Sequence, residues 1–413
     1  MKKFLLIVTI FLAVSCVCFA QMPSAYEAVS KYYRVYSEVS TNHAQETAQK
    51  LDAFFELFNS YFHFDTAKLT SKLNVRIFDS TEGYNSYLSA IIGATKESFV
   101  YLQYSDLKKS ELVGFQQDPA AFNTSLLRHG FVQFLKSYIK NPPLWMQRGF
   151  ALYFEKCVFD DEHNFAIYRE NLSWLPTLKQ LIQNSIDFSE EDSRVLIPLQ
   201  TLLNPDSFTT DSQKDIFYAQ SWGLITFLEG SQNKQYNRLL WDAIRLIKAD
   251  ATLEENEQAV KKSMLTWVNE HLLVSDFISY INNMKTFPEL VKAGVESYSQ
   301  GNYDDAEEIF IQAVVLDANH NLPYYYLGLI HYARKDYSLA EYYYQSALML
   351  GSDPALIYFA LGLNAFADGR MEEAGSYLKE ARTADPDTYL DKTEDLLLRI
   401  ENMSVSLETN EGE

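Results

Sequence analysis

The last third of the chain repeats with a period of 34 residues, which sharply limits the folds open to it. Three sets of small residues recur at this spacing: Gly294, Gly328 and Gly362; Ala306, Ala340 and Ala374; and Ala313, Ala347 and Ala381. A large side chain follows the first alanine of each unit by four positions, at Phe310, Tyr344 and Leu378. Small residues at fixed positions let two helices approach closely, and the large residue fills the space between them. The period predicts three stacked helix pairs, over residues 287–320, 321–354 and 355–388.

This pattern resembles the tetratricopeptide repeat, whose units form an α-α superhelix. Pro386 ends the third unit as the family pattern requires, whereas Ala318 and Ser352 replace that proline in the first two units. A stacked array must shield its last apolar face, so we expect a capping helix over residues 389–402. The polar residues 403–413 are expected to form a disordered tail.

The geometry of paired helices predicts which residues of the repeats line a binding surface. In each unit the first helix should line the concave face, and the predicted groove residues are apolar or aromatic: Val291, Val295, Tyr298, Tyr325, Leu329, Tyr332, Phe359, Leu363 and Phe366. Repeats that grip a peptide carboxylate place Lys, Arg and Asn at such positions, so we expect no carboxylate clamp here. Either this strip binds a protein or peptide partner, or it packs against the rest of the same chain.

The repeats also carry most of the negative charge. The formal net charge of the chain is −20, and from residue 287 onward 23 Asp and Glu stand against 8 Lys and Arg, a balance of −15. This excess favours a basic partner, although an acidic surface that serves solubility alone is the other interpretation. A phosphate backbone would be repelled, so nucleic-acid binding is not expected.

The first twenty residues have the organisation of a targeting segment. Two lysines precede an apolar run over residues 4–14, and the segment ends at Ala20, a small residue of the kind that precedes signal-peptidase cleavage. We therefore expect residues 1–20 to be a signal peptide and the mature protein to be secreted across the inner membrane, as a periplasmic or envelope-associated protein. The segment Ala13-Val14-Ser15-Cys16 also resembles a lipobox, which would make the protein a lipoprotein with a lipid anchor at Cys16. No later apolar run is long enough for a transmembrane span.

Between this segment and the repeats, the sequence predicts helices around a small β-sheet. Aromatic residues at helical spacing predict two helices within residues 24–65. Runs of β-type residues predict strands at residues 73–78, 98–104 and 111–116, separated by polar turns. Helices are expected over residues 126–138 and 145–157. Later tryptophans, Trp222, Trp241 and Trp267, are expected in the helical core.

Residues 144–155 resemble a motif of the gluzincin-type peptidases known as peptidase MA-like. Outside the critical glutamate, the motif Pro-x-Trp-Leu-x-Glu-Gly-x-Ala-x-Tyr-x-Glu is closely matched by Leu144-Trp145-Met146-Gln147-Arg148-Gly149-Phe150-Ala151, with Tyr153 and Glu155. Tyr218-Ala219-Gln220-Ser221-Trp222-Gly223 resembles a helix that members of this family often carry. The resemblance implies a zincin-like α+β domain over residues 21–286, and tetratricopeptide repeats commonly accompany such a domain.

The resemblance also identifies the positions at which zinc chemistry would occur. The family's His-Glu-x-x-His places two imidazoles on one helix face, with the glutamate as general base, and a glutamate of the next helix is the third ligand. The corresponding stretch here is His129-Gly130-Phe131-Val132-Gln133, and the third-ligand position is Arg148. The first histidine is kept, while the base, the second imidazole and the carboxylate ligand are replaced.

Arg148 is the decisive change, because a guanidinium stays protonated and would lie where a dication belongs. At about 4 Å and an effective dielectric of about 20, one unit pair costs about 4 kcal/mol and a dication about twice that. A structural zinc site has an apparent binding energy of roughly 10–16 kcal/mol, so the penalty removes much of it. We expect Arg148 to fill the vacated space and to hydrogen-bond Gln133 or a nearby carboxylate.

The sequence offers no replacement site. None of the seven histidines lies four residues from another, and the three cysteines lack zinc-ligand spacing. Asp160-Asp161-Glu162-His163 is the densest group of ligand-type residues and is interpreted as a solvated loop. We therefore expect no metal and no cofactor. His129 is either a vestigial ligand or polar contact in a remodelled cleft, or a helix histidine that hydrogen-bonds a backbone carbonyl.

The expected fold is mainly α with a small β-sheet: a zincin-like α+β domain followed by an α-α superhelical repeat array. The expected function is that of a non-catalytic cell-envelope scaffold or adaptor that binds protein partners through its repeats and keeps an inactive peptidase-like domain. Two alternatives stay open. One is a protein that binds a hydrophobic ligand or lipid on the aromatic concave face or in the emptied cleft, and the other is an active hydrolase with atypical ligands.

Overall fold

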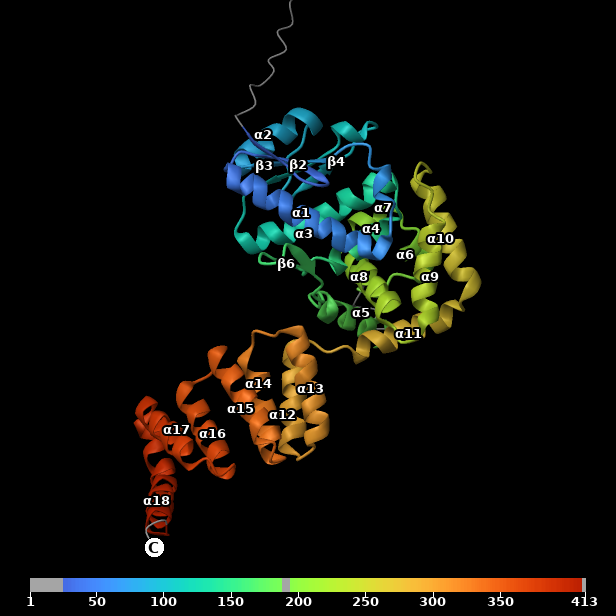
Figure 1. Cartoon of the computed structure of the whole chain (residues 1–413). Coiled ribbons are helices and arrows are strands. Elements are labelled where there is room, and N and C mark those ends of the chain that lie inside the picture. The colour runs from blue at the N-terminus through green and yellow to red at the C-terminus, as the bar shows by residue number, and fades with distance from the viewer. Residues whose placement is uncertain (1–24, 188–193, 411–413) are drawn as a thin grey trace, which may run out of the picture. The chain divides into compact units, whose positions relative to one another are not determined.

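The chain consists of two compact units, one ending at Ile278 and one beginning at Ser279 (Figure 1). The computed structural model describes residues 25–187 and 194–410, so the expected signal peptide and Cys16 lie outside the described residues. The fold is mainly helical with a small sheet, which confirms this part of the predicted fold class. Within the described ranges, no helix combines the length and apolar character that a membrane crossing needs.

A five-stranded sheet forms one side of the N-terminal unit. Its strands are β1 (Tyr26–Val29), β2 (Tyr33–Ser37), β3 (Leu73–Phe78), β4 (Val100–Leu102) and β5 (Glu111–Phe115), in the order β1-β2-β3-β5-β4. The three central strands are parallel, and both edge strands pair antiparallel. Helix α2 (Thr81–Ile92) covers one face, while α1 (Thr41–Phe62) and α3 (Pro119–Tyr138) cover the other (Figure 1). Because helices lie on both faces, all five residues of β5 are buried.

The sheet is larger than the sequence predicts. Residues 26–37, expected to be helical, form β1 and β2, so only one helix lies between residues 24 and 65. In β2 the buried Tyr33, Val35 and Ser37 alternate with the more exposed Arg34 and Tyr36, which is the two-residue period of a strand. Neighbouring tyrosines had concealed that alternation.

Helix α2 replaces a segment that was expected to be a polar turn. Its first turn is capped by Ser80, whose hydroxyl accepts a hydrogen bond from the Gly83 amide at 3.3 Å. The three strands predicted at residues 73–78, 98–104 and 111–116 form at those places as β3, β4 and β5.

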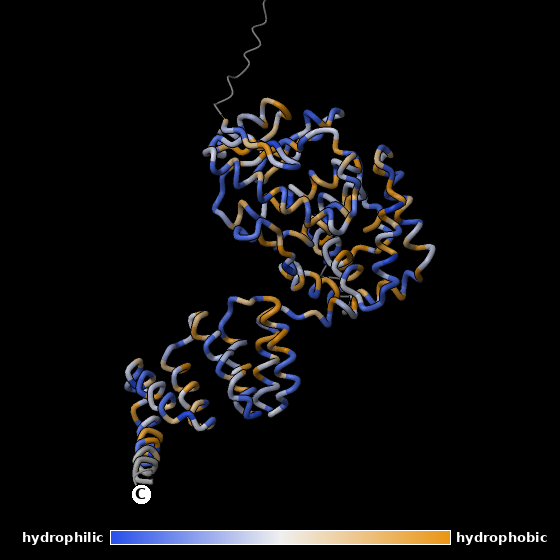
Figure 2. Tube along the Cα trace, in the orientation of Figure 1, coloured by the Kyte–Doolittle hydropathy of each residue, from blue (hydrophilic) through white to orange (hydrophobic). Residues whose placement is uncertain are grey.

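An aromatic core joins α1, α3 and α4 (Leu144–Tyr153). Phe58 of α1 contacts Phe131 of α3 edge to face with ring centroids 5.2 Å apart, and Phe62 contacts Phe150 of α4 at 4.9 Å. Such aromatic pairs add roughly 0.5–1.5 kcal/mol each beyond the burial of their area. Figure 2 shows hydrophobic residues gathered in the sheet and in the helices packed on it. Helix α3 begins seven residues before the expected start, because Asp118 caps it by accepting from the Ala121 amide at 3.0 Å.

The rest of this unit is helical, apart from a hairpin of β6 (Val158–Asp160) and β7 (Phe165–Ile167). Its helices are α5 (Leu175–Asp187), α6 (Leu199–Leu203), α7 (Ser207–Asp211), α8 (Lys214–Gly230), α9 (Lys234–Arg245) and α10 (Leu253–Trp267), and α11 (Glu270–Asn283) begins in this unit and ends in the next. Trp222 of α8 is 1% exposed, as predicted, whereas Trp267 is 80% exposed at the end of α10, so the prediction for Trp267 is wrong.

Helices α4 and α8 approach each other closely at Gly149. A Cβ atom on Gly149 would lie 2.5 Å from both the Ser221 carbonyl oxygen and Ile225 Cγ1. Only glycine therefore permits this distance between the two backbones, and the same contact places Arg148 beside α8.

The C-terminal unit consists of paired antiparallel helices. They are α12 (Phe287–Ser299) with α13 (Tyr303–Leu316), α14 (Asn321–Ala333) with α15 (Tyr337–Met349), and α16 (Pro354–Ala367) with α17 (Met371–Ala384), followed by α18 (Pro386–Asn410). The first two pairs fall within the predicted units 287–320 and 321–354, and the third pair begins one residue before the predicted unit 355–388. Helix α18 continues to Asn410, beyond the expected end of the cap at residue 402 and into the residues expected to form the tail.

The repeated glycines make the close contact within each pair. A Cβ atom on Gly294, Gly328 or Gly362 would lie 2.5–2.8 Å from the partner helix's large residue, which is Phe310, Tyr344 or Leu378 respectively. These large residues are at most 1% exposed. Glycine and large residue thus form one packing unit that recurs every 34 residues.

Charged side chains tie neighbouring repeats together. Arg334, which follows α14, pairs with Asp304 and Glu307 of α13. Arg370, before α17, donates to Glu341 of α15 at 2.6 Å. In addition, the fully buried Asn364 donates to the Tyr337 carbonyl oxygen at 2.9 Å. These contacts fix the register of one repeat on the next.

The glycine contact generates a prediction for Gly328→Ala. The added methyl group would lie 2.5 Å from the ring of the buried Tyr344, and overpacking of this kind costs about 1–3 kcal/mol. We expect the C-terminal unit to unfold at lower denaturant concentration, as measured by far-UV circular dichroism of the full chain.

Gly375→Ala of α17 is the matched control. Its Cβ would meet only Ile400 Cγ2, at 3.8 Å, so alanine should instead stabilise the helix by about 0.5–1 kcal/mol. Equal effects of the two substitutions would contradict the packing argument.

Candidate functional site

The positions at which the family would bind zinc lie on α3 and α4 and do not form a metal site. His129 is half-buried on α3, with its ring 6.2 Å from that of Phe99. Burial is the main reason that the pKa of His129 falls to about 3, and the positive charges of Arg128 and Arg148 contribute to this shift. The imidazole is therefore neutral at physiological pH.

Gln133 and Arg148 point to different partners. Gln133 is fully buried, and its amide nitrogen donates to the Asn74 carbonyl oxygen of β3 at 2.8 Å. The Arg148 guanidinium lies over the Tyr218 ring of α8, 4.8 Å from the ring centroid. The expected hydrogen bond from Arg148 to Gln133 or a carboxylate is wrong, because the close approach of α4 to α8 brings an aromatic face to the guanidinium. Arg148 nevertheless lies near enough to His129 to lower its pKa.

Gly130 is a buried residue of α3 that faces α1. Its Cβ position would be 3.3 Å from Leu51 Cδ2, so the glycine lets α1 approach α3. The position that would hold the general base in the resembled family thus takes part in helix packing here.

A buried ion pair lies beside these residues. Glu155 is 5% exposed and accepts hydrogen bonds from Arg128 and, at 3.1 Å, from the side-chain amide of Asn171. Because a buried carboxylate must be paired, Glu155 serves to neutralise Arg128 and is not available as a ligand. Residues 25–187 and 194–410 contain no group of three or more His, Cys, Asp or Glu side chains placed to hold a metal ion.

The nine predicted groove residues of the repeats share one environment. All of them are half-buried on the first helices of their pairs. Val295 and Tyr298 pack against a core of Phe310, Leu327 and neighbours, while Tyr325, Leu329 and Tyr332 pack against a core that contains Tyr344. They therefore support the helix pairs with one part of the side chain and keep another part accessible.

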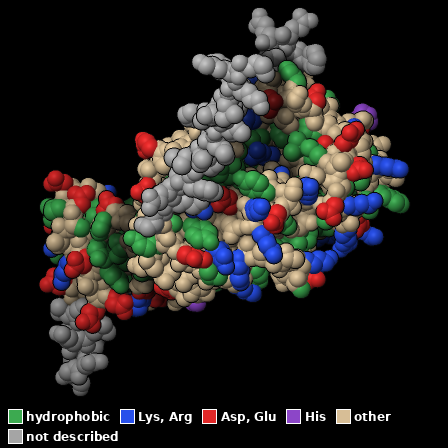
Figure 3. Space-filling model, turned by 90° about the horizontal axis from the view of Figure 1, so that it is seen from above, with side chains coloured by type: hydrophobic (Ala, Val, Ile, Leu, Met, Phe, Trp, Pro, Cys, Tyr) green, Lys and Arg blue, Asp and Glu red, His purple; other side chains and the backbone are tan. Residues whose placement is uncertain are grey.

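Helix α18 covers one end of this strip. Tyr389 of α18 packs on Phe359 with ring centroids 5.1 Å apart, and Leu396 and Leu397 contact the core around Leu378. The third repeat is thus partly covered by the chain itself. On the face shown in Figure 3, acidic side chains are frequent on the C-terminal unit and basic ones on the N-terminal unit.

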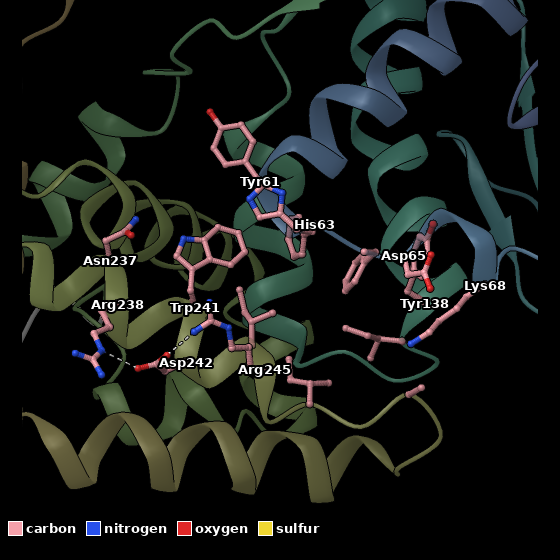
Figure 4. A pocket seen from close by; sticks show the side chains of 16 residues that line it. Tyr61, His63, Asp65, Lys68, Tyr138, Asn237, Arg238, Trp241, Asp242 and Arg245 are labelled. Carbon is pink, nitrogen blue, oxygen red and sulfur yellow. Dashed lines mark hydrogen bonds and ion pairs between the residues drawn. The ribbon is translucent and has the colours of Figure 1, made fainter.

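A cavity that the sequence did not indicate lies in the N-terminal unit. It has a volume of about 810 Å³, and the ends of α1 and α3 line it together with α9. Its wall is aromatic, with Phe62, Phe64, Tyr138 and Trp241, and Asp242 of its rim bonds both Arg238 at 3.2 Å and Arg245 at 2.9 Å (Figure 4). This volume is within the range of small-molecule sites. The lining residues come from segments far apart in the sequence, and Trp241 was taken for core, so no local pattern revealed the cavity.

Glu229 of α8 is a half-buried residue next to this cavity. It accepts from the side-chain amide of Asn237, a lining residue, at 3.1 Å. Burial raises the pKa of Glu229 from 4.5 to about 7. The proton is therefore held more tightly in the folded chain than in the unfolded one.

This shift predicts how stability depends on pH. Because the folded-state pKa is raised, the stabilisation from proton binding is complete below pH 4.5 and is lost as the pH rises through about 7. Glu229→Gln imitates the protonated form, so it should stabilise the N-terminal unit by about 1 kcal/mol above pH 7, after allowance for partial solvent screening, and have little effect below pH 4.5. Thermal unfolding at both pH values measures this, with the exposed Glu254→Gln as control. An equal gain at both values would refute it.

Comparison with known proteins supports the repeats. Residues 291–355 match the model of the tetratricopeptide repeat family. The first tetratricopeptide domain of human RPAP3 is 20% identical over 30% of this chain and 95% of its own, with a TM-score of 0.28. The Yersinia enterocolitica type III secretion translocator chaperone SycD is 21% identical over 33% of this chain and 95% of its own, with a TM-score of 0.26. No curated protein matches the chain. The family match over residues 291–355 supports the predicted tetratricopeptide-like repeats of the C-terminal unit, whereas these comparisons give no support to a peptidase-like N-terminal unit.

Proposed function

We propose that this protein is a non-catalytic adaptor that binds a protein or peptide partner on the concave face of its repeats. The observation that carries the proposal is the chemistry of nine groove positions, which hold only apolar and aromatic side chains and are all half-buried. Tetratricopeptide arrays present such faces as extended binding surfaces. The absence of cations at these nine positions argues against recognition of a carboxylate, so the partner should contribute apolar side chains.

The charge of the repeats favours a basic partner. Residues from 287 onward have 23 acidic and 8 basic side chains, so a positively charged segment would be attracted during approach. Apolar contacts in the groove and acidic residues around it together suit a partner that carries both apolar and basic residues.

The proposed location is the cell envelope, and the N-terminal unit is proposed to be a peptidase-like scaffold without activity. The location rests on the organisation of residues 1–20, with a lipid anchor at Cys16 as the alternative to cleavage after Ala20. The inactivity rests on Gly130, Gln133 and Arg148, because none of them provides the base or the ligands that the resemblance requires.

The groove is tested by photo-crosslinking in the native cell. We replace Leu363 with p-benzoylphenylalanine and, as a matched control, Met349, which is 80% exposed on α15 and is not a groove position. We expect a discrete adduct from position 363 and none from position 349. Adding Tyr332→Lys to the variant with the crosslinker at position 363 should abolish the adduct, because partner binding would then require desolvation of a charge in the groove. Adducts of equal yield at both positions, or none at either, would contradict partner binding in the groove.

The inactivity is tested by elemental analysis and a generic peptidase assay on the purified mature chain. We expect far less than one zinc per chain and no turnover, because Arg148 excludes a dication. The triple substitution Gly130→Glu, Gln133→His and Arg148→Glu should gain zinc binding if the scaffold geometry is kept. Near-stoichiometric zinc with turnover in the unmodified protein would favour the alternative of an active hydrolase.

A further inference from the structure

Basic side chains of three helices lie near Arg148 in the N-terminal unit. Arg128 and Lys136 come from α3, Arg148 from α4 and Lys214 from α8. The first three are half-buried, and Lys214 is exposed. We refer to these four side chains as the basic cluster. This concentration of positive charge contrasts with the net charge of −20 of the whole chain.

Arg148 has no acceptor among the residues that the structure describes. Its contact is the Tyr218 ring, at 4.8 Å, and Lys214 lies 5.6 Å from the centroid of the same ring. A cation on an aromatic face gains up to about 2 kcal/mol, but the ring leaves the N–H donors of the guanidinium unused. A half-buried guanidinium without an acceptor is unusual, since buried charges are normally paired.

The other members add charge that is only partly neutralised. Arg128 pairs with Glu155, yet its buried Nε atom has no hydrogen-bond partner within the described part of the chain. Lys136 donates to the Gln103 side-chain oxygen at 3.0 Å, a neutral acceptor. Glu155 therefore balances Arg128, whereas no carboxylate in the described part of the chain pairs with Arg148 or Lys136.

The basic groups are close enough to affect one another. Burial lowers the pKa of Lys136, and the charge of Arg148 lowers it further. Burial also lowers the pKa of Arg148, and Arg128 acts in the same direction. The chain thus holds like charges together in a partly desolvated place, which is unfavourable unless an anion joins them.

We propose that the basic cluster is a binding site for the carboxylate or phosphate group of a ligand, with Arg148 as its main contact. A guanidinium offers paired donors that match two oxygens of either group, and such charge-assisted pairs are among the strongest hydrogen bonds in proteins. Lys136 supplies a second positive charge, and Lys214 supplies an exposed one beside the Tyr218 ring. An anion here would neutralise charges that the fold leaves unbalanced. The inference concerns the N-terminal unit and does not depend on partner binding by the repeats.

The test is ligand-dependent thermal unfolding of the mature chain at constant ionic strength. Succinate and inorganic phosphate are the anionic probes, and succinamide is the neutral analogue. We expect one or both anions to raise the unfolding temperature of the N-terminal unit, while succinamide and sodium chloride do not. The anion with the larger effect identifies the carboxylate or the phosphate as the recognised group.

Arg148→Gln should weaken the binding of the effective anion about 10- to 100-fold, the range expected for the loss of a charge-assisted bidentate contact. Arg238→Gln is the matched control, because Arg238 is an exposed arginine of the same unit with a side chain 83% accessible, and it should leave the anion effect unchanged. Arg148→Lys keeps the charge but loses the planar fork, so it should bind with intermediate affinity and provides the measurement if Arg148→Gln folds poorly. No selective shift in the unmodified protein, or equal shifts in both glutamine variants, would overturn the proposal.

Discussion

Close approach of helix backbones across glycine is the constraint on which both units depend. In the repeats, Gly294, Gly328 and Gly362 each lie against a large buried residue of the partner helix, so that one contact type builds the whole array. In the N-terminal unit, Gly149 brings α4 against α8 at a distance that a single methyl group would prevent. Packing at protein-interior density makes such positions intolerant of even one added carbon.

The approach at Gly149 also determines the chemistry of its neighbour. Because α4 lies so near α8, the Arg148 guanidinium meets the Tyr218 ring instead of Gln133, which bonds to strand β3. Arg148 occupies the position at which the resembled motif has a carboxylate, and its contacts differ from those expected of a substituted ligand. This residue places a positive charge, held by aromatic contact, in a position where His129 stays neutral and Glu155 is already paired.

The sequence allowed prediction of the array almost to the residue, because a 34-residue period ties each helix to equivalent small and large residues. The strands β3, β4 and β5 were also predictable from short runs of β-type residues. The first two strands were not, since adjacent tyrosines obscured the alternation of Tyr33, Val35 and Ser37. Trp267 shows the other limit: an aromatic residue in a helical pattern was taken for core, yet it is 80% exposed.

The candidate sites, like the fold, were only partly predictable from the sequence. Residues 129, 130, 133 and 148 could be aligned with a family motif, but their partners Asn74 and Tyr218 come from distant segments that no spacing rule connects. The cavity beside Trp241 is likewise made by the ends of helices that are separated in the chain. These contacts depend on the direction in which each side chain points. Tertiary packing determines that direction, and it cannot be predicted from a single sequence.

The ion pairs between repeats have a mechanical consequence. Arg334 and Arg370 link successive repeats through Glu307 and Glu341, while the glycine contacts lie within each pair and carry no charge. Dissolved ions screen the first kind of contact and leave the second intact. Higher ionic strength should therefore weaken the ion pairs between repeats and leave the packing within each helix pair unchanged.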